Sequence, residues 1–453
     1  MKLVIIGCTH AGISAIKQVL KYYPEVEITV YERHASISYL SCATYLHIGG
    51  SVENLDDALY ADPQEFTSLG VNMKMQHDVI EIDAKNHSIL VQDMQTKELF
   101  HDHYDKLIMA SGSRTTLPII TGIENPKVML CKTLNQAIKL EKAAKNHRNI
   151  AILGGGYAGV ELAEGFAKSG HQVLLLQRNK YLLDEYMDAK MAEKVKSLLK
   201  NHNIKVVTDA NVVRFEDTDD GRVKISTANE SYVSEMVAIC PGVLPQSDLL
   251  KGQVKLAQNG AILTNEYMES SDPDILAAGD VTNIHFNLTD GPMYVPLASH
   301  AIRQGNLAGM NLLKHRLRSI GSQATTGMQI FDQIIACTGL TYLKAKAAGF
   351  DAQHVFFHNN YRPAFMPTNT EISIELIYDR KTRKVLGAQL MSAHEISQSA
   401  NTISVIIQNG NTIDELAYVD MLFQPNFDEP FNYLNLVAQM AVDKEFDYKQ
   451  ANK

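Results

Sequence analysis

The sequence has no tryptophan and only five cysteines among its 453 residues. The cysteines are odd in number and far apart, which excludes the paired framework of a small disulfide-stapled secreted protein. We therefore expect a cytoplasmic protein with reduced thiols. The apolar run before Cys8 follows a single lysine. It is shorter than the ~7–15 apolar residues of a secretory signal, so we do not expect it to be one.

Long apolar runs and clustered positive charge are also missing. No stretch approaches the roughly 18 consecutive apolar residues of a membrane-spanning helix, so the sequence predicts no membrane segment. The formal charge is −9, and no basic stripe is present. Both features argue against a nucleic acid partner. We assign no metal site. Hydrophobic residues make up 45% of the chain, enough for about two to four domains with their own cores.

The N-terminus has the pattern of a nucleotide-binding strand, turn and helix. An apolar run leads into a turn with Gly7 and Gly12, and apolar residues at helical spacing follow. The next apolar strand ends at Glu32, the place where an acid binds ribose hydroxyls in dinucleotide sites. Thr9 occupies the position of the middle glycine of the strict pattern. For this segment alone, an ordinary strand-to-helix turn remains the alternative.

The same pattern recurs near residue 150, this time in full. Gly154, Gly156 and Gly159 form a G-x-G-x-x-G sequence between an apolar strand and a helix, which is typical of a dinucleotide site. At the end of the next strand, however, Gln177 stands in place of an acid and Arg178 follows it. A neutral amide beside a guanidinium does not repel a 2′-phosphate, so the choice between NADH and NADPH stays open.

Three further strands end in small or polar residues. Asp280 follows an apolar run, where its carboxylate can bind the ribityl chain of a flavin. The strand before Ser111 and the strand before Gly242 are each followed by a turn that contains a glycine. Each of these ends alone also fits an ordinary buried strand. Two nucleotide sites in one chain indicate one tightly bound redox cofactor and one that exchanges.

In this order and spacing the motifs resemble the flavoprotein disulfide reductases with two dinucleotide domains. Within them, the chain is most similar to the single-cysteine branch of NADH oxidases, NADH peroxidases and coenzyme A disulfide reductases. The resemblance covers essentially the whole chain and includes "GCTHAGISA", "ERHASISYLSCATYL", "ASGS", "GGGYAGVELAE", "AAGDV" and "LASHAIRQGNLAG". The late segments "NNYRPAFMPT" and "FQPNFDEPFNYLN" look most like the water-forming NADH oxidases.

The resemblance implies an α/β fold with two Rossmann-like dinucleotide-binding domains and a C-terminal α+β dimerisation domain. The FAD-binding domain is expected to be discontinuous, at residues 1–118 and 247–320. The NAD(P)-binding domain is expected at 119–246 and the dimerisation domain at 325–453. A turn near Arg380 predicts a hairpin in the last of these. The chain is expected to form a homodimer whose C-terminal loop completes the partner's active site; an independent cap is the alternative.

The resemblance also implies two sets of site residues. FAD is expected to contact Gly7, His10, Ala11, Gly12, Glu32, Ser41, Cys42, Val79, Ala110, Ser111, Gly112, Ser113, Lys132, Asp280, Ala298, Ser299 and Phe423. NADH or NADPH is expected along Gly154, Gly156, Tyr157, Ala158, Gly159, Glu161, Gln177, Tyr186 and Gly242. In the family, the counterpart of Tyr157 covers the flavin, and the counterpart of Glu161 lies beside flavin and nicotinamide.

Cys42 is the expected reactive thiol. A dithiol reductase needs a second cysteine about five residues on, but His47 stands there. A lone thiol can instead cycle through a sulfenic acid. The resemblance therefore implies an FAD-dependent oxidase that reduces O₂ to water through a flavin hydroperoxide and peroxide, which the Cys42 thiolate converts to water. The pKa of this thiol is expected to fall beside the electron-poor ring of an oxidised flavin and nearby donors. His10 is expected to be a neutral hydrogen-bond donor at a helix start.

Three alternatives remain open. An NADH peroxidase would accept only H₂O₂, and it shares every residue named above. A coenzyme A disulfide reductase carries tyrosines in the late loop, where this chain has Phe423 and Phe427. In a flavin redox sensor, Cys42 would report peroxide to a protein partner. A sensor is expected to have an exposed apolar patch or an added interaction module, and we expect no spare segment for one in this chain. The remaining cysteines, Cys8, Cys131, Cys240 and Cys337, are expected to be inert core residues.

Overall fold

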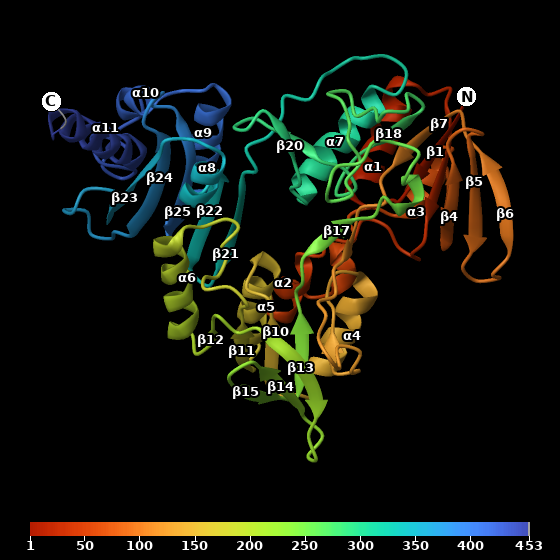
Figure 1. Cartoon of the computed structure of the whole chain (residues 1–453), viewed down its shortest axis with the longest axis horizontal. Coiled ribbons are helices and arrows are strands. Elements are labelled where there is room, and N and C mark those ends of the chain that lie inside the picture. Colours follow the sequence, from red (N-terminus) through yellow and green to blue (C-terminus); the bar gives the residue numbers. More distant parts are fainter. Residues whose placement is uncertain (452–453) are drawn as a thin grey trace.

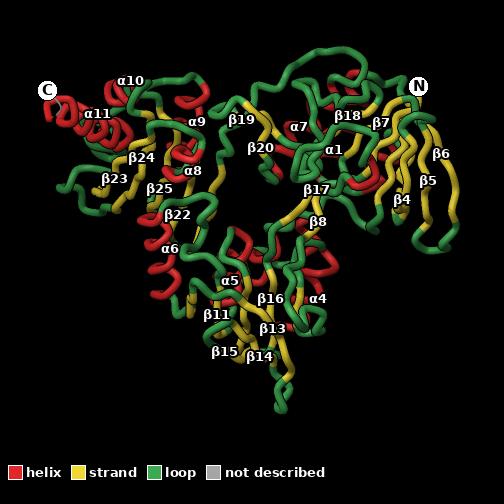
Figure 2. Tube along the Cα trace, viewed as in Figure 1, coloured by secondary structure: helices red, strands yellow, loops and turns green. Residues whose placement is uncertain are grey.

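The chain folds into three lobes, each built around a five-stranded sheet (Figures 1 and 2). The computed structural model describes residues 1–451. In Figure 1 the N-terminal and C-terminal lobes lie at opposite sides, and the middle lobe lies below them. This mixed α/β architecture agrees with the predicted fold class, whereas the residue boundaries of the three domains stay predictions.

The N-terminal lobe combines segments from both halves of the sequence. Its sheet is parallel, and the apolar side chains of its strands are buried on both faces, as is usual for parallel sheets. The strand order is β18 (Ile275–Ala277), β7 (Lys106–Met109), β1 (Lys2–Ile6), β2 (Glu27–Glu32) and β3 (Asn72–Met75). A late strand therefore completes a sheet that the N-terminus begins.

Two helices of the N-terminal lobe, α1 (His10–Tyr22) and α7 (Ala298–Met310), pack tightly on each other. The contact depends on small residues, because a Cβ on Gly305 would lie 2.2 Å from the backbone oxygen of Ala11. The smaller elements of this lobe are α2 (Ala43–Ile48), η1 (Leu55–Ala58), α3 (Pro63–Ser68), β4 (His77–Asp83), β5 (Ser88–Asp93), β6 (Leu99–His103), η2 (Asp248–Leu250), β19 (Ile284–Phe286) and β20 (Gly291–Met293).

The middle lobe repeats the parallel plan. Its sheet order is β12 (Lys205–Val207), β11 (Gln172–Leu176), β10 (Asn149–Leu153), β16 (Met236–Ile239) and β9 (Val128–Met129). Its remaining elements are α4 (Leu134–Ala144), α5 (Tyr157–Lys168), α6 (Ala189–Asn201), β13 (Val212–Asp217), β14 (Val223–Thr227) and β15 (Ser231–Ser234). The antiparallel pair β8 (Ser113–Thr115) and β17 (Val243–Pro245) joins this lobe to the first.

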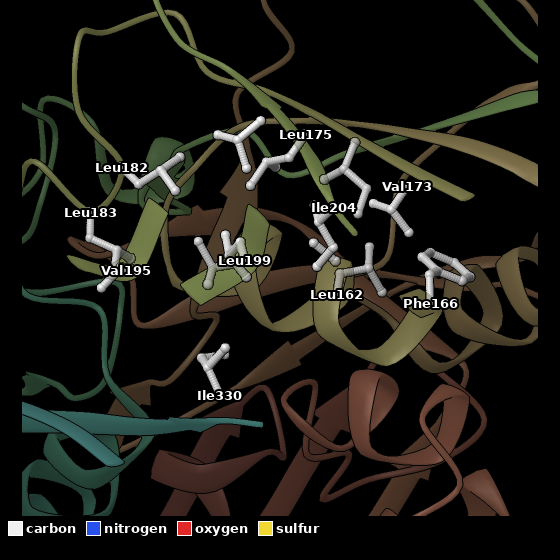
Figure 3. Close-up of a cluster of buried hydrophobic side chains, with 14 of the residues drawn as sticks. Leu162, Phe166, Val173, Leu175, Leu182, Leu183, Val195, Leu199, Ile204 and Ile330 are labelled. Carbon is white, nitrogen blue, oxygen red and sulfur yellow. The ribbon is translucent and has the colours of Figure 1, made fainter. Parts of the chain in front are cut away.

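The hydrophobic core of the middle lobe extends into the C-terminal lobe (Figure 3). Phe166 of α5, Leu175 of β11 and Leu199 of α6 are fully buried in it. Ile330, from the C-terminal lobe, belongs to the same cluster. The two lobes therefore share one apolar interior.

The C-terminal lobe is an antiparallel sheet with helices. The order is β21 (Thr326–Ile330), β22 (Gln333–Gly339), β25 (Val385–Ser392), β24 (Glu371–Asp379) and β23 (Ala352–Asn360). The helices are α8 (Tyr342–Ala347), α9 (Ser397–Gln408), α10 (Ile413–Tyr418) and α11 (Tyr433–Ala451). Strands β24 and β25 form the hairpin that the turn near Arg380 predicts. Within residues 1–451, every helix is too short or too polar to span a bilayer.

Candidate active site

A cavity of about 720 Å³ opens at the carboxyl ends of the parallel strands of the N-terminal lobe. Ligand pockets typically measure about 300–1,000 Å³, and nucleotides bind this edge of parallel α/β sheets. The cavity brings together residues from many separate segments. The predicted FAD residues that line it are Gly7, His10, Ala11, Glu32, Ser41, Val79, Ala110, Ser111, Gly112, Ser113, Lys132, Asp280 and Ala298.

The turn between β1 and α1 forms one end of this cavity. Gly7 has a φ of 93°, and a Cβ there would lie 2.4 Å from the backbone oxygen of Ala110. A Cβ on Gly12 would lie 2.1 Å from the backbone oxygen of Gly7. Both glycines are thus required by the tight turn, and Gly12 supports the turn from behind instead of lining the cavity. The first residues of α1 face the cavity, and free N–H groups at a helix start suit a phosphate.

Glu32 ends β2 and is buried beside the same turn. Its carboxylate accepts hydrogen bonds from the backbone N–H groups of Cys8, at 2.8 Å, and His34, at 2.9 Å. The carboxylate therefore fixes the conformation of the turn. Because Glu32 also lines the cavity, it stands where a ribose would be recognised.

A chain of three polar side chains follows one wall of the cavity. The Ser113 hydroxyl donates to the Asp280 carboxylate at 2.8 Å, and the Lys132 ammonium donates to the Ser113 hydroxyl at 2.5 Å. Burial lowers the pKa of Lys132, while the Asp280 charge acts in the opposite direction. These hydrogen bonds join three segments that lie far apart in the sequence.

His10 begins α1 and forms a pair with Tyr60. Its Nδ1 lies 2.9 Å from the Tyr60 hydroxyl, and the two rings stack with centroids 5.7 Å apart. Burial lowers the pKa of His10, and the Asp280 carboxylate partly offsets this. Burial thus favours the neutral imidazole that the sequence predicts. Tyr60 is not among the residues predicted from the sequence, because nothing in its local pattern marks it.

Cys42 directly precedes α2 and is exposed. Helix α2 packs on α5 of the middle lobe, and Gly165 allows this contact because a Cβ there would lie 2.7 Å from the backbone oxygen of Tyr45. Partial burial of the thiol and the carboxylate of Glu161 both raise the pKa of Cys42. Since the fall was expected beside the ring of a bound flavin, it stays a prediction, and the protein groups, burial first, act against it.

Glu161 lies on the first turns of α5. Burial, followed by the charge of Glu164, raises the pKa of Glu161 to about 7. Glu161 is therefore close to half-protonated at neutral pH. A carboxyl group in this state can hold or release a proton beside the Cys42 thiol.

The second glycine turn, between β10 and α5, leaves an open backbone surface. Gly154 has a φ of 117°, and a Cβ on Gly159 would lie 1.8 Å from the backbone oxygen of Gly154. Gly156 caps α5, and no atom lies within 4 Å of the place its Cβ would occupy. The same holds for Gly242, and Ala158 is exposed. A phosphate can approach this helix start closely.

Gln177 is buried behind the second turn. Its amide oxygen accepts from the backbone N–H of Gly155 at 3.0 Å, and its amide nitrogen donates to the backbone oxygen of Tyr181 at 3.2 Å. The amide oxygen thus takes the position that the Glu32 carboxylate takes in the first lobe. Arg178, the next residue, is exposed.

The rings of Tyr157 and Tyr186 pack against each other with centroids 4.4 Å apart. The Tyr157 hydroxyl lies 3.3 Å from Sγ of Cys337 in the C-terminal lobe. Burial raises the pKa of Tyr157 well above its usual range and that of Tyr186 to about 12. Tyr157 therefore contacts protein on at least two sides, and its covering role stays a prediction.

Three further residues predicted to contact FAD, Cys42, Ser299 and Phe423, do not line the cavity of the same chain. Ser299 lies on α7 beside lining residues but does not face the cavity. Phe423 is 48% exposed and lies between α10 and α11, which Figure 1 draws at the opposite side of the molecule from α1. Within one chain, Phe423 is not part of the cavity wall.

Comparison with known families covers most of the chain. Residues 1–305 match the family described as "Pyridine nucleotide-disulphide oxidoreductase". Residues 326–434 match the "Pyridine nucleotide-disulphide oxidoreductase, dimerisation domain".

Curated relatives are similar over their full length. An NADH oxidase of Enterococcus faecalis is 42% identical over 98% of this chain and 100% of its own. An NADH oxidase of Lactococcus lactis is 34% identical over 97% of this chain and 100% of its own. An NAD(P)H coenzyme A polysulfide/persulfide reductase of Pyrococcus horikoshii is 28% identical over 97% of this chain and 98% of its own.

Two solved structures share the whole fold. A water-forming NADH oxidase from Lactobacillus brevis, bound to NADH, is 44% identical and superposes with a TM-score of 0.97 over 99% of both chains. An engineered water-forming NADPH oxidase made from it, bound to NADPH, is also 44% identical with a TM-score of 0.97, over 99% of this chain and 100% of its own.

Proposed function

The chain belongs to the pyridine nucleotide-disulphide oxidoreductase family, and on this basis we propose that it is an FAD-dependent NAD(P)H oxidase that reduces O₂ to water. The observation that carries the proposal is Cys42, a lone thiol whose pKa responds to the Glu161 carboxylate at the contact of the first two lobes. The cytoplasmic location stays a prediction.

The cavity residues fit FAD. The turn at Gly7 leaves no room for a side chain, so backbone N–H groups can bind the pyrophosphate. Glu32 would bind the adenosine ribose, and Asp280 with Ser113 would bind the ribityl hydroxyls. When bound, FAD supplies two-electron transfer between the nicotinamide and O₂. The backbone around Gly156 would bind the pyrophosphate of NADH or NADPH.

Cys42 would complete the reduction of O₂ to water. The first NADH and O₂ yield hydrogen peroxide. The Cys42 thiolate then attacks one peroxide oxygen, the O–O bond breaks, hydroxide leaves as water, and the sulfur becomes a sulfenic acid. Two electrons from a second NADH restore the thiol and release the other oxygen as water. His10 would donate a hydrogen bond to the peroxide, since its neutral ring keeps one N–H.

Arg178 supports use of NADPH as well as NADH. In the engineered NADPH oxidase, one substitution replaces an aspartate with a neutral residue, and the next introduces an arginine directly after it. This chain has the same pattern naturally, with Gln177 followed by an exposed Arg178. A guanidinium at this place can bind the 2′-phosphate.

We also propose a homodimer. The chain contains the family's dimerisation domain, and Phe423 is not part of the cavity wall of its own chain. In a dimer, the segment between α10 and α11 would complete the cavity of the partner.

Two other functions of the same enzyme class remain candidates, and a relative of this chain supports one of them. An NADH peroxidase would use the same Cys42 step with supplied H₂O₂. A coenzyme A persulfide or disulfide reductase is favoured by the full-length similarity to the Pyrococcus enzyme. Both differ from the oxidase in the acceptor they need.

The electron acceptor that the enzyme requires distinguishes these functions. The oxidase is expected to consume two NADH per O₂ and to release no peroxide. Cys42→Ser is expected to consume one NADH per O₂ and to release H₂O₂, because the thiolate that reduces peroxide is missing. Oxygen-electrode and peroxide assays measure both. NADH consumption only after H₂O₂ or a coenzyme A disulfide is added would contradict the oxidase, and water formation by Cys42→Ser would contradict the thiol step.

A further inference from the structure

Two cysteines outside the proposed thiol step lie side by side in the middle lobe. The Sγ atoms of Cys131 and Cys240 are 4.0 Å apart, although 109 residues separate them in the sequence. Both thiols are free and half-buried. The two thiols are therefore neighbours, and the expectation that they are inert core residues stays a prediction.

The register of the sheet explains the pairing. Strands β9 and β16 are parallel neighbours, with Val128 opposite Val237 and Met129 opposite Ala238. Cys131 and Cys240 follow at the same offset, just beyond the ends of both strands. Neighbouring strands lie about 4.8 Å apart, and disulfides bridge Cα atoms about 4.4–6.8 Å apart. Rotation of the two side chains, together with a small shift of the backbone, would bring the sulfurs within bonding distance.

The surroundings distinguish the two thiols. The contact with Cys240 lowers the pKa of Cys131, whereas the pKa of Cys240 is raised by that contact, by burial and by Glu161. Because burial and the Glu161 carboxylate both raise the pKa of Cys240, we take Cys131 as the attacking thiol. The Glu161 carboxylate acts on the pKa values of both Cys240 and Cys42. The pair thus lies in the same electrostatic neighbourhood as the reactive thiol.

We propose that Cys131 and Cys240 form a second redox site, which a hydroperoxide oxidises to an intrachain disulfide. The Cys131 thiolate attacks one peroxide oxygen, the O–O bond breaks, and hydroxide leaves and is protonated to water. The sulfur of Cys240 then attacks the sulfenic sulfur of Cys131, loses its proton and displaces the second oxygen as water. The two thiols lose two electrons, and the peroxide gains them.

The disulfide would act on both cofactor sites. Cys131 directly precedes Lys132, whose ammonium binds Ser113 in the wall of the cavity. The backbone oxygen of Cys240 lies 2.5 Å from the position of a Cβ on Gly154, in the second glycine turn. Drawing the sulfurs together would therefore shift both Lys132 in the cavity wall and the support of the second glycine turn. Displacements of about 1 Å in an active site can cost up to about 100-fold in rate.

Mass spectrometry of the full-length holoprotein tests the site directly. Cys42→Ser serves as the background, because it removes the competing oxidation of Cys42. After treatment with hydrogen peroxide, we expect the intact mass to fall by two hydrogen atoms. A non-reducing digest should contain a Cys131–Cys240 crosslinked peptide, and dithiothreitol should restore the original mass.

Two variants in the same background separate this pair from other thiols. The matched control Cys337→Ser removes another buried cysteine and should keep the crosslink, whereas Cys131→Ser should abolish it. No crosslink in the background protein, or a crosslink that persists in Cys131→Ser, would overturn the proposal. If Cys42→Ser does not fold, the same peptide is sought in the peroxide-treated wild type.

An activity measurement tests the link to the cofactor sites. Diamide oxidises paired thiols, so it is expected to slow NADH consumption by the wild type about tenfold, with recovery in dithiothreitol. Cys240→Ser should keep its own rate after the same treatment. A crosslinked wild type with an unchanged rate would overturn this link.

Discussion

At the scale of single residues, the reactivity of Cys42 depends on the proton of Glu161. The pKa of Glu161 is raised from 4.5 to about 7, so Glu161 becomes negative as the pH rises through 7, and its charge then raises the pKa of Cys42. We expect Glu161→Gln to move the pH midpoint of Cys42 alkylation by iodoacetamide to lower values and to speed alkylation severalfold at pH 7. Peptide mass spectrometry measures the reaction.

The raised pKa of Glu161 also predicts how the stability of Glu161→Gln, relative to the wild type, changes with pH. A carboxyl group with a raised pKa in the folded state destabilises the fold as pH rises from 4.5 to 7, so the variant should gain relative stability over this range.

For the alkylation experiment, Glu193→Gln, at an exposed position of α6, is the control and should leave the alkylation midpoint of Cys42 unchanged. An unchanged alkylation midpoint in Glu161→Gln would rule out the charge effect.

Arg178 is the residue expected to decide how well NADPH is used. Removing its guanidinium leaves the 2′-phosphate without a charged partner, at a cost of about 1–3 kcal/mol. We expect Arg178→Ala to raise the KM for NADPH at least tenfold while the KM for NADH changes little. Steady-state kinetics with both nucleotides measure this. Lys205→Ala, on the neighbouring strand β12, is the control. An equal rise in the KM values for both nucleotides in Arg178→Ala would contradict the assignment.

At the scale of elements, glycines set how closely the helices approach. A Cβ on Gly305 would lie 2.2 Å from the backbone oxygen of Ala11, so Gly305→Leu must push α7 away from α1. We expect the free energy of unfolding to fall by about 1–3 kcal/mol, although leucine favours the helical conformation by about 1 kcal/mol over glycine. Unfolding followed by flavin fluorescence measures it. Ile302→Leu, at an exposed position of α7, should be neutral, and equal stability of both variants would refute the contact.

At the scale of the whole molecule, exposed apolar residues gather between α10 and α11. Leu422, Phe423 and Phe427 are 68%, 48% and 62% exposed, and such patches mark interaction surfaces. Burying a phenylalanine contributes about 1.5–3 kcal/mol. Phe427→Asp should therefore raise the dimer dissociation constant at least tenfold in analytical ultracentrifugation.

Activity and dimerisation are expected to fall together in Phe427→Asp, because the segment would complete the partner's cavity. Leu343→Asp, on α8 with a 67% exposed side chain, is the matched control and should leave the dimer intact. An unchanged dimer dissociation constant in Phe427→Asp would show that the dimer interface lies elsewhere.

The sequence by itself determined the two nucleotide turns, the strand ends at Glu32 and Asp280 and the hairpin near Arg380, because each depends on local spacing and turn chemistry. Only the tertiary structure decided which distant groups meet. Tyr60 stacks on His10, Glu161 raises the pKa of Cys42, Gln177 binds the second turn, and Cys131 faces Cys240. These contacts arise from sheet register and helix packing, which join residues far apart in the chain and leave no periodic signal in it.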